Sequence, residues 1–459
     1  MTGPEHGAPP PAPGDETGDP AAEAPATEAE APEASPDAGG PVAAAPAAEA
    51  PKAAPQRARR PRSLRRRLAF AAAALALCLL VCLLLLEVGL RLSGWQIRSM
   101  HPLGSLSHYH PTRGREHVPG REVVLEGGAF KPLTFRINRF GFRDPHDTPP
   151  ERRAKKRVVV VGDSFTWGWG VGEEDTFTEK LAPQLGAEVV NMGHNAYGTG
   201  QEWLLLREDG MKWKPDVVLV GFFLGNDFSD NIYHRWRRPH FDVGPDGRVV
   251  LSNVPIPNPL SERLSDGLKA RSLAYFYLSY YGRKARNRIE GSERWYGQLY
   301  RKLSASRERE KDEERPDTSF YGMFRDPPDD TLREAYRVTE ALLGEVKRTC
   351  DEGQARLVVV CFPRRDMVEP DLWATETARE GMDPAALDKD LPIRKLAEMC
   401  QRQGIEFFDT TPALRAATEA GQVTYLPLGI HWSAEGHGVV ADALAHQCDA
   451  IRALRNGAK

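Results

Sequence analysis

The sequence lacks the features that mark several common classes of protein. Its 61 basic and 64 acidic residues nearly balance, so no basic surface for nucleic acid is expected. Its six cysteines form no CxxC pair, which argues against a zinc site and against a dense disulfide framework. It also contains no GxxxxGK[ST] segment, so a soluble nucleotide-binding protein with a phosphate loop is not indicated.

Two stretches near the start of the chain are unusual in charge: the first has no positive charge and the second has no charge of either sign. Residues 1–50 contain ten acidic residues and no Lys or Arg, and residues 1–56 are mostly Ala, Pro, Glu and Gly, a composition typical of disorder. Eight Lys and Arg residues follow between Lys52 and Arg67, and then 19 uncharged residues run from Leu68 to Leu86. As a helix this run would be about 28 Å long, roughly the hydrocarbon thickness of a bilayer.

The uncharged run favours an uncleaved membrane anchor over two alternatives. A buried helix of a soluble protein normally carries a polar face, and a cleaved signal peptide ends in a small-residue cleavage site. Neither feature is present, and Glu87, Gly89 and Arg91 follow the run. Because positive charge is concentrated before the span, we expect a cytoplasmic N-terminus and an extracytoplasmic remainder, periplasmic if the envelope has two membranes.

Apolar runs bounded by Gly, Pro, Asn and Asp alternate with helical patterns from about residue 155. Such runs are typical of strands buried on both faces of a parallel sheet, and the alternation indicates a three-layer α/β/α fold. The five expected strands lie in "RVVVVGD", "AEVVNMG", "PDVVLVGFFLGND", "ARLVVVCFP" and "IEFFDTT". Residues 231–330 break this rhythm and are expected to form an insertion beside the active-site edge. Their charge run, "SREREKDEERPD", favours a solvated surface over a partner-binding site.

These patterns predict five parts along the chain. The acidic tail is more typical of a tolerated low-complexity segment than of a dedicated binding site. The parts are a disordered cytoplasmic tail (1–56), a basic juxtamembrane segment (57–67), a transmembrane helix (68–90), an extracytoplasmic linker with a pre-catalytic segment (91–154) and an α/β domain (155–455).

Ser164 directly follows the first expected strand and is a candidate nucleophile. Asp163 is placed to cap a helix that begins there, although a capped helix after a strand is also common in nucleotide-binding folds. A nucleophilic serine needs a base and donors for an oxyanion. The second and third strands end in "VVNMGHNAYGTGQE" and "GFFLGND", where a backbone N–H near Ala196 and the side-chain amide of Asn226 are candidate donors. Either stretch alone is equally typical of a plain turn.

The segment "YLPLGIHWSAEGHGVVADAL" supplies a candidate base near the C-terminus. His431 lies in a loop just before a helical pattern. His437 is a rival six residues later, but that spacing places the two side chains on different faces of a helix, so a structural or supporting role is favoured over a metal site. Trp167, Trp169 and Trp432 adjoin these residues and either stack on sugar rings or pack within the protein.

The four blocks "GDSF", "NMGHNAYG", "GND" and "HWSAEGH", in this order over residues 157–450, resemble those of the SGNH (GDSL-type) hydrolase superfamily. The segments "LEVGLRLSG" and "FRINRFGFRD" are similar to parts of its membrane-anchored bacterial members. The resemblance implies a flavodoxin-like sheet, ester chemistry, most often deacylation or acyl transfer on carbohydrates, and no cofactor. It implies Ser164 as nucleophile, His431 as general base, and an oxyanion hole from the Ser164 N–H, a second-block N–H and the Asn226 side chain. The family usually has Gly where Ala196 stands, so Ala must adopt the local backbone conformation.

The acid of the family's triad is not at its usual place. The family has Asp two or three residues before the His, where this sequence has Gly429 and Leu428, and residues 421–430 contain no Asp or Glu. Three replacements remain open: a backbone carbonyl, a carboxylate from elsewhere such as Asp227 or Glu435, or a Ser/His dyad without an acid.

Two functions of different classes follow from these observations. The first is a membrane-anchored extracytoplasmic esterase or acyltransferase that acts on acylated carbohydrate or another ester, without metal or cofactor. The second is a catalytically degenerate SGNH domain that binds glycan or scaffolds polysaccharide assembly in the envelope. Only one membrane span is expected, so a transferase would receive its acyl group from a separate membrane partner or a soluble donor.

Overall fold

The computed structural model describes residues 64–93, 98–99, 106–127, 130–234, 237–290, 322–427 and 429–457. The expected tail, the basic segment up to residue 63, the charge run of the insertion and Leu428 lie outside the described residues. The chain divides into two units, Met1–Leu68 and Ala69–Lys459. Within the first unit, the described residues form the first turn of helix α1, and all other elements belong to the second.

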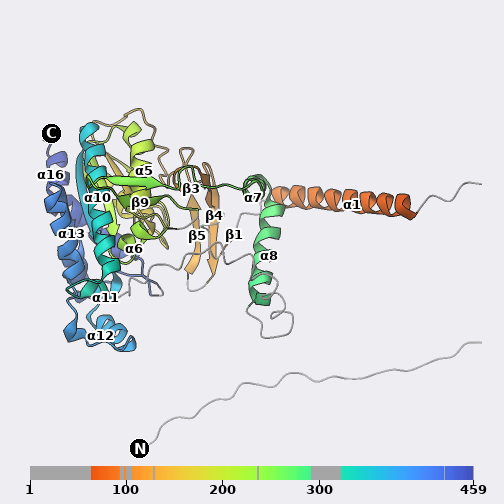
Figure 1. Ribbon diagram of the computed structural model, residues 1–459. Coiled ribbons are helices and arrows are strands. Elements are labelled where there is room, and N and C mark those ends of the chain that lie inside the picture. Colours follow the sequence, from red (N-terminus) through yellow and green to blue (C-terminus); the bar gives the residue numbers. More distant parts are fainter. Residues whose placement is uncertain are drawn as a thin grey trace, which may run out of the picture. The chain divides into compact units, whose positions relative to one another are not determined.

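A five-stranded parallel sheet forms the centre of the second unit (Figure 1). Its strands are β6 (Arg157–Gly162), β7 (Glu188–Asn191), β8 (Val217–Phe223), β11 (Arg356–Phe362) and β12 (Glu406–Asp409). Their spatial order is β12-β11-β8-β6-β7, which is 2-1-3-4-5 when counted from the other edge. This is the order of a flavodoxin-like, doubly wound sheet. The predicted fold class is confirmed, and each of the five strands lies in one of the expected apolar runs.

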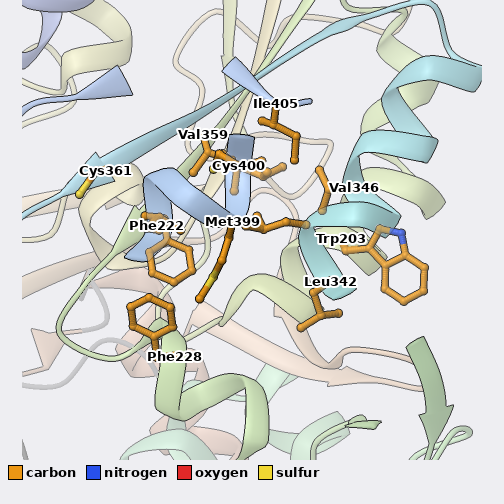
Figure 2. Packing of buried hydrophobic residues seen from close by; sticks show 14 of the residues in the cluster. Trp203, Phe222, Phe228, Leu342, Val346, Val359, Cys361, Met399, Cys400 and Ile405 are labelled. Atoms are coloured by element: carbon orange, nitrogen blue, oxygen red, sulfur yellow. The ribbon is translucent and has the colours of Figure 1, made fainter. Parts of the chain in front are cut away.

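Helices cover both faces of the sheet because successive strand side chains point to opposite faces. Val159 and Val161 of β6 belong to a core shared with α5 (Thr199–Glu208), α10 (Asp330–Glu352) and α13 (Leu391–Arg402). Figure 2 shows part of this core, with Trp203 of α5, Leu342 of α10 and Met399 of α13. Val158 and Val160 belong instead to the core that includes α4 (Phe177–Leu185), α15 (Ala434–Gln447) and α16 (Asp449–Arg455).

Smaller elements surround this three-layer domain. Before it lie a three-stranded sheet in the order β1-β4-β5 and the β2–β3 hairpin, and the insertion contains the β9–β10 hairpin and two helices, α7 and α8. Their bounds are β1 (Arg98–Ser99), β2 (Ser107–His110), β3 (Gly114–His117), β4 (Glu122–Gly127), β5 (Phe130–Arg136), β9 (His240–Val243), β10 (Val249–Ser252), α7 (Leu260–Arg271) and α8 (Leu273–Glu290). The remaining helical elements are α3 (Ser164–Trp167), α6 (Asp227–Ile232), α11 (Arg365–Val368), α12 (Pro370–Arg379), α14 (Thr411–Glu419), η1 (Gly210–Trp213), η2 (Gly322–Phe324) and η3 (Pro384–Ala386).

Helix α1 (Leu64–Leu92) contains the long uncharged run. Within the described part of the chain it is the one helix long and apolar enough to cross a membrane, with a mean hydropathy of 3.0 over its most apolar window. None of that window is buried against the protein. Length and composition therefore agree with the predicted span.

Candidate active site

Ser164 lies in the tight turn that follows β6. The Asp163 carboxylate accepts a hydrogen bond from the Phe165 N–H (2.8 Å), which caps the start of α3. Gly168 ends α3 with a φ of 84°, a left-handed conformation that favours glycine. The sequence predicts a helix at this place, and the structure forms a single turn of it because Gly168 ends it so early.

Arg143, from the pre-catalytic segment, holds this turn from the opposite end. Its guanidinium donates to the carbonyl oxygens of Trp167 (2.8 Å) and Val171 (2.7 Å) and also to that of Gly168. It lies over the ring of Trp167, 4.8 Å from the centroid. Burial lowers the pKa of Arg143 to about 10, so the side chain is still charged at neutral pH. The buried guanidinium of Arg143 therefore stabilises the Ser164 turn by donating hydrogen bonds to its carbonyl oxygens.

His431 is brought to Ser164 although 267 positions separate them in the sequence. The distance between Ser164 Oγ and His431 Nε2 is 2.7 Å, a hydrogen bond. An antiparallel bridge between Tyr425 and Trp432 shapes the loop that carries His431. Burial lowers the pKa of His431 to about 4, so its imidazole is neutral at neutral pH and Nε2 is able to accept the hydroxyl proton.

The ends of β7 and β8 lie on either side of this turn, since these strands neighbour β6. The loop after β7 packs so closely that a side chain on Gly193 would meet the backbone nitrogen of Trp167 at 2.5 Å. The same loop approaches α6, where a side chain on Gly198 would meet Cβ of Asp230 at 2.9 Å. The three strand ends that carry Ser164, Ala196 and Asn226 are thus packed together, as the convergence of parallel strand ends predicts.

Ala196 and Asn226 are linked by a polar network. Asn226 Nδ2 donates to Asp230 Oδ2 (2.7 Å), and Asp230 Oδ1 pairs with Arg238 (3.4 Å). Arg238 also donates to the Ala196 carbonyl oxygen (2.6 Å). One amide proton of Asn226 is therefore directed at Asp230, and the other has no acceptor among the described residues. Arg238, which lies in the insertion, was not identified from the sequence.

Ala196 itself has a φ of 59°. A residue with a Cβ adopts this left-handed conformation at a cost of about 1–2 kcal/mol. The conformation explains why glycine is usual at this position, and it is maintained here in a loop anchored by Arg238.

Residues 323–458 match the protein family described as the SGNH hydrolase-like domain of acetyltransferase AlgX. This stretch contains His431 and begins after the other three candidate residues. This part of the chain is therefore similar to an SGNH hydrolase-like domain. No curated protein matches the chain.

Several solved structures are similar to this chain at low identity. LAE5, an alpha/beta hydrolase from the metagenome of Lake Arreo, Spain, is 13% identical (65% of this chain, 97% of that chain, TM-score 0.33). A catalytic mutant of an acetylxylan esterase from Geobacillus stearothermophilus is 11% identical (64% and 95%, TM-score 0.32). A GDSL-like lipase from Bacteroides thetaiotaomicron is 11% identical (68% and 94%, TM-score 0.31).

No carboxylate of the described residues forms a hydrogen bond or an ion pair with His431. The two carboxylates considered as replacements are directed elsewhere. Asp227 Oδ2 accepts from the Phe223 N–H (2.7 Å), and Glu435 Oε2 accepts from the Val423 N–H (2.8 Å). Neither a carboxylate nor a backbone carbonyl oxygen of the described residues accepts a hydrogen bond from the His431 side chain, which leaves a Ser/His pair supported by other contacts.

Arg365 and two aromatic rings supply such contacts. Arg365, at the start of α11, directs its guanidinium to the carbonyl oxygens of Leu426 (3.2 Å), Pro427 (3.2 Å) and Gly429 (3.4 Å), which lie in the loop before His431. The rings of Phe165 and Trp169 lie 4.8 and 6.1 Å from the imidazole, centroid to centroid. The loop is thus held by a cation and the imidazole by aromatic packing. Arg365 was not identified from the sequence, although the pair of arginines directly after the fourth strand, in "FPRRD", was a usable signal.

The three tryptophans near the site do not share one role. Trp167 and Trp432 are fully buried, with 0% of their surface exposed, so both pack inside the protein. Trp169 is partly exposed beside His431, so of these three tryptophans it is the one with a surface open to solvent. His437 is buried and its Nδ1 accepts a hydrogen bond from the Phe177 N–H (3.2 Å) at the start of α4, a structural contact.

Three buried carboxyl groups lie behind the strand ends. Burial, together with the nearby Asp163 and Asp230, raises the pKa of Glu202 well above its usual range. Burial and the neighbouring Glu202 and Asp163 do the same for Asp227. Burial, with a smaller effect of Asp230, raises the pKa of Asp163 to about 7. These shifts favour the protonated forms of Glu202 and Asp227, and Asp163, next to Ser164, has a pKa close to neutral pH.

Proposed function

We propose that this chain is a membrane-anchored serine esterase or acyltransferase that uses Ser164 and His431. The contact of 2.7 Å between Ser164 Oγ and His431 Nε2 at the carboxyl end of the sheet carries this proposal. The match of residues 323–458 to an SGNH hydrolase-like family supports ester chemistry in general. The neutral state of the buried His431 imidazole supports its use as a base.

The reaction starts with proton transfer from Ser164 to His431. Oγ attacks the acyl carbonyl carbon while Nε2 accepts the hydroxyl proton, and the carbonyl oxygen becomes an oxyanion. The backbone N–H groups of Ser164 and Ala196 and the free amide proton of Asn226 are the proposed donors to this oxyanion. His431 then returns its proton to the departing alcohol, which leaves an ester of the acyl group with Ser164.

Release of the acyl group repeats these steps with a new acceptor. Water or a sugar hydroxyl attacks the acyl-enzyme, gives its proton to His431 and takes the acyl group, and Oγ regains its proton. With water the protein is a hydrolase and with a sugar it is a transferase. A transferase would need a donor molecule or a membrane partner that brings the acyl group, and hydrolysis needs neither.

The missing acid sets an expectation for the rate. In serine-protease triads, the acid accepts a hydrogen bond from the histidine. Loss of that bond lowers turnover about 10⁴-fold, because the imidazole is no longer held in the correct tautomer and orientation. Here the loop contacts of Arg365 and the packing of Phe165 and Trp169 supply orientation without a negative charge. We therefore expect a slow enzyme with an intact nucleophile.

Acylated carbohydrate is the proposed substrate, and the outer side of a membrane is the proposed location. The matching family is described as that of an acetyltransferase, and Trp169 offers an aromatic face beside the reacting pair. The apolar helix α1, preceded by arginines, supports an anchor with a cytoplasmic N-terminus.

Acetate release from acetylated polysaccharides tests this function. The full-length protein is expected to release acetate, or to transfer it to added oligosaccharide, and Ser164→Ala is expected to abolish both. Ser252→Ala, an exposed serine at the end of β10, is the matched control and should retain the wild-type rate. Equal rates for wild type and Ser164→Ala would contradict the proposal.

A degenerate glycan-binding domain is the second candidate. The observation that favours it is the lack of a carboxylate beside His431 among the described residues. It predicts that oligosaccharide binds equally to wild type and to Ser164→Ala, while neither protein turns over an ester. Calorimetric titration combined with the acetate assay separates the two functions.

A further inference from the structure

Helix α7 exposes a stripe of leucines. Leu260, Leu264 and Leu268 are spaced four residues apart, so they lie on one face of the helix. Their exposed fractions are 66%, 58% and 47%. A surface helix of a soluble protein normally turns such a stripe to the core.

The charged face of α7 is turned to the protein instead. Glu262 and Asp266 both pair with Arg237 (3.3 and 3.4 Å), which precedes the β9–β10 hairpin, and Lys269 pairs with Asp266 (3.5 Å). These side chains lie on the side of the helix opposite to the leucines. The ion pairs therefore fix α7 with its apolar face outward, so the exposure of the leucines follows from the packing.

Helix α8 continues the surface with aromatic and then basic residues. Phe276 is buried in the small core that contains Phe135 and Trp167, so α8 is anchored to the catalytic domain. Leu278 and Tyr281 of the same helix are exposed. The following turns carry four basic residues with exposed side chains: Arg283, Lys284, Arg286 and Arg288. Tyrosines beside basic residues are typical of the boundary between membrane and water.

The junction of α7 and α8 is bonded to the end of α1. Glu87 Oε2 accepts hydrogen bonds from Ser272 Oγ and from the Ala274 N–H, both 2.9 Å. Arg91 donates to the Arg271 carbonyl oxygen (2.7 Å). These contacts cap the start of α8 and the end of α7. The turn between α7 and α8 therefore lies at the end of α1 from which the chain leaves the predicted membrane span.

We propose that α7 and the first half of α8 form an interfacial hairpin whose leucine stripe enters the bilayer that α1 spans. The apolar stripe lies at the level of the acyl chains nearest the surface, and the basic turns of α8 lie among anionic headgroups. This inference rests on the proposed membrane span. The proposal gives the insertion a role. The hairpin contacts the catalytic domain on one side and lipid on the other, and it therefore keeps the active site close to the membrane surface.

Depth-dependent quenching tests the proposal on the full-length protein. Cys78 and Cys82 are replaced by Ala, since the other four cysteines are buried, and one new cysteine is labelled with an environment-sensitive dye. The test positions are Leu264→Cys and Leu268→Cys. The control is Val423→Cys, which is 56% exposed and lies outside the insertion. Each protein is reconstituted into vesicles of phosphatidylcholine and phosphatidylglycerol, with and without nitroxide-labelled lipid.

The dyes at positions 264 and 268 are expected to emit as in an apolar environment and to lose most of their emission with nitroxide lipid. The dye at position 423 is expected to emit as in water and to keep its emission. Water-like, unquenched emission at 264 and 268 would overturn the proposal. Emission that is shielded from water but not quenched would also overturn it, because a second copy or another protein would then cover the stripe. Alkaline carbonate extraction of the same vesicles reports on α1 separately, so failure of the anchor and failure of the hairpin are distinguishable.

Discussion

Replacement of Arg365 by Met tests how the base is held without an acid. Met keeps much of the length of the side chain but removes the donors to Leu426, Pro427 and Gly429. Hydrogen bonds from a charged donor contribute about 1.5–3 kcal/mol when buried. The Arg365 side chain is 25% exposed and its contacts are long. We therefore expect these contacts to stabilise the ordered conformation of the His431 loop by only about 1–2 kcal/mol. That corresponds to a loss of about 5–30-fold in the rate at which Ser164 reacts.

The assay is the second-order rate of labelling of the full-length protein by a fluorophosphonate. Arg365→Lys, which retains a positive charge, is expected to recover part of the rate. Arg379→Met is the matched control, because Arg379 forms an exposed ion pair with Glu376 on α12, and its rate should equal that of wild type. A wild-type rate for Arg365→Met would refute the reasoning. So would a lower thermal stability with an unchanged rate, since Arg365 would then be merely structural.

Three further predictions concern strain and charge at the site. Ala196→Gly should stabilise the fold by about 0.5–1 kcal/mol, because the φ of Ala196 is 59° and glycine adopts this conformation without strain. The control Ala182→Gly, inside α4, should instead destabilise the fold by about 1 kcal/mol. Equal effects of the two substitutions in thermal unfolding would contradict the strain at Ala196. The labelling rate should stay constant as the pH falls to about 5 and decrease near pH 4, because burial lowers the pKa of His431 to about 4; a midpoint near pH 7 would instead indicate a hidden acid. The pKa of Glu202 is raised in the folded state, so its stabilising effect is complete below its unfolded pKa and is lost as the pH rises toward the folded pKa. Glu202→Gln should therefore reduce the fall in stability that begins above about pH 4.5, by up to about 1.4 kcal/mol per pH unit, and an unchanged slope would show that folding does not raise the pKa of Glu202.

The sheet could be predicted because its strands are buried on both faces and leave continuous apolar runs. The candidate residues could be predicted for a related reason. Ser164, Ala196 and Asn226 each follow such a run, and parallel strands end at one edge, so their proximity follows from the topology once the order of strands is known. His431 was identified through the block it belongs to, and the structure places it against Ser164.

The supporting contacts could not be predicted because they join distant segments. Arg365 reaches carbonyl groups 61 to 64 positions away, and Arg143 reaches the Ser164 turn about 25 positions away. Neither contact leaves a periodic pattern in the sequence. Whether Trp167 and Trp432 face a ligand or the core depends on packing as well, and both proved to be buried.

The most direct test of an activated Ser164 compares fluorophosphonate labelling of the full-length wild type, Ser164→Ala and His431→Ala. The contact of 2.7 Å between Oγ and Nε2 predicts that wild type is labelled, that Ser164→Ala is not, and that His431→Ala is labelled far more slowly. Labelling that survives Ser164→Ala, or that is unaffected by His431→Ala, would contradict a Ser164–His431 mechanism.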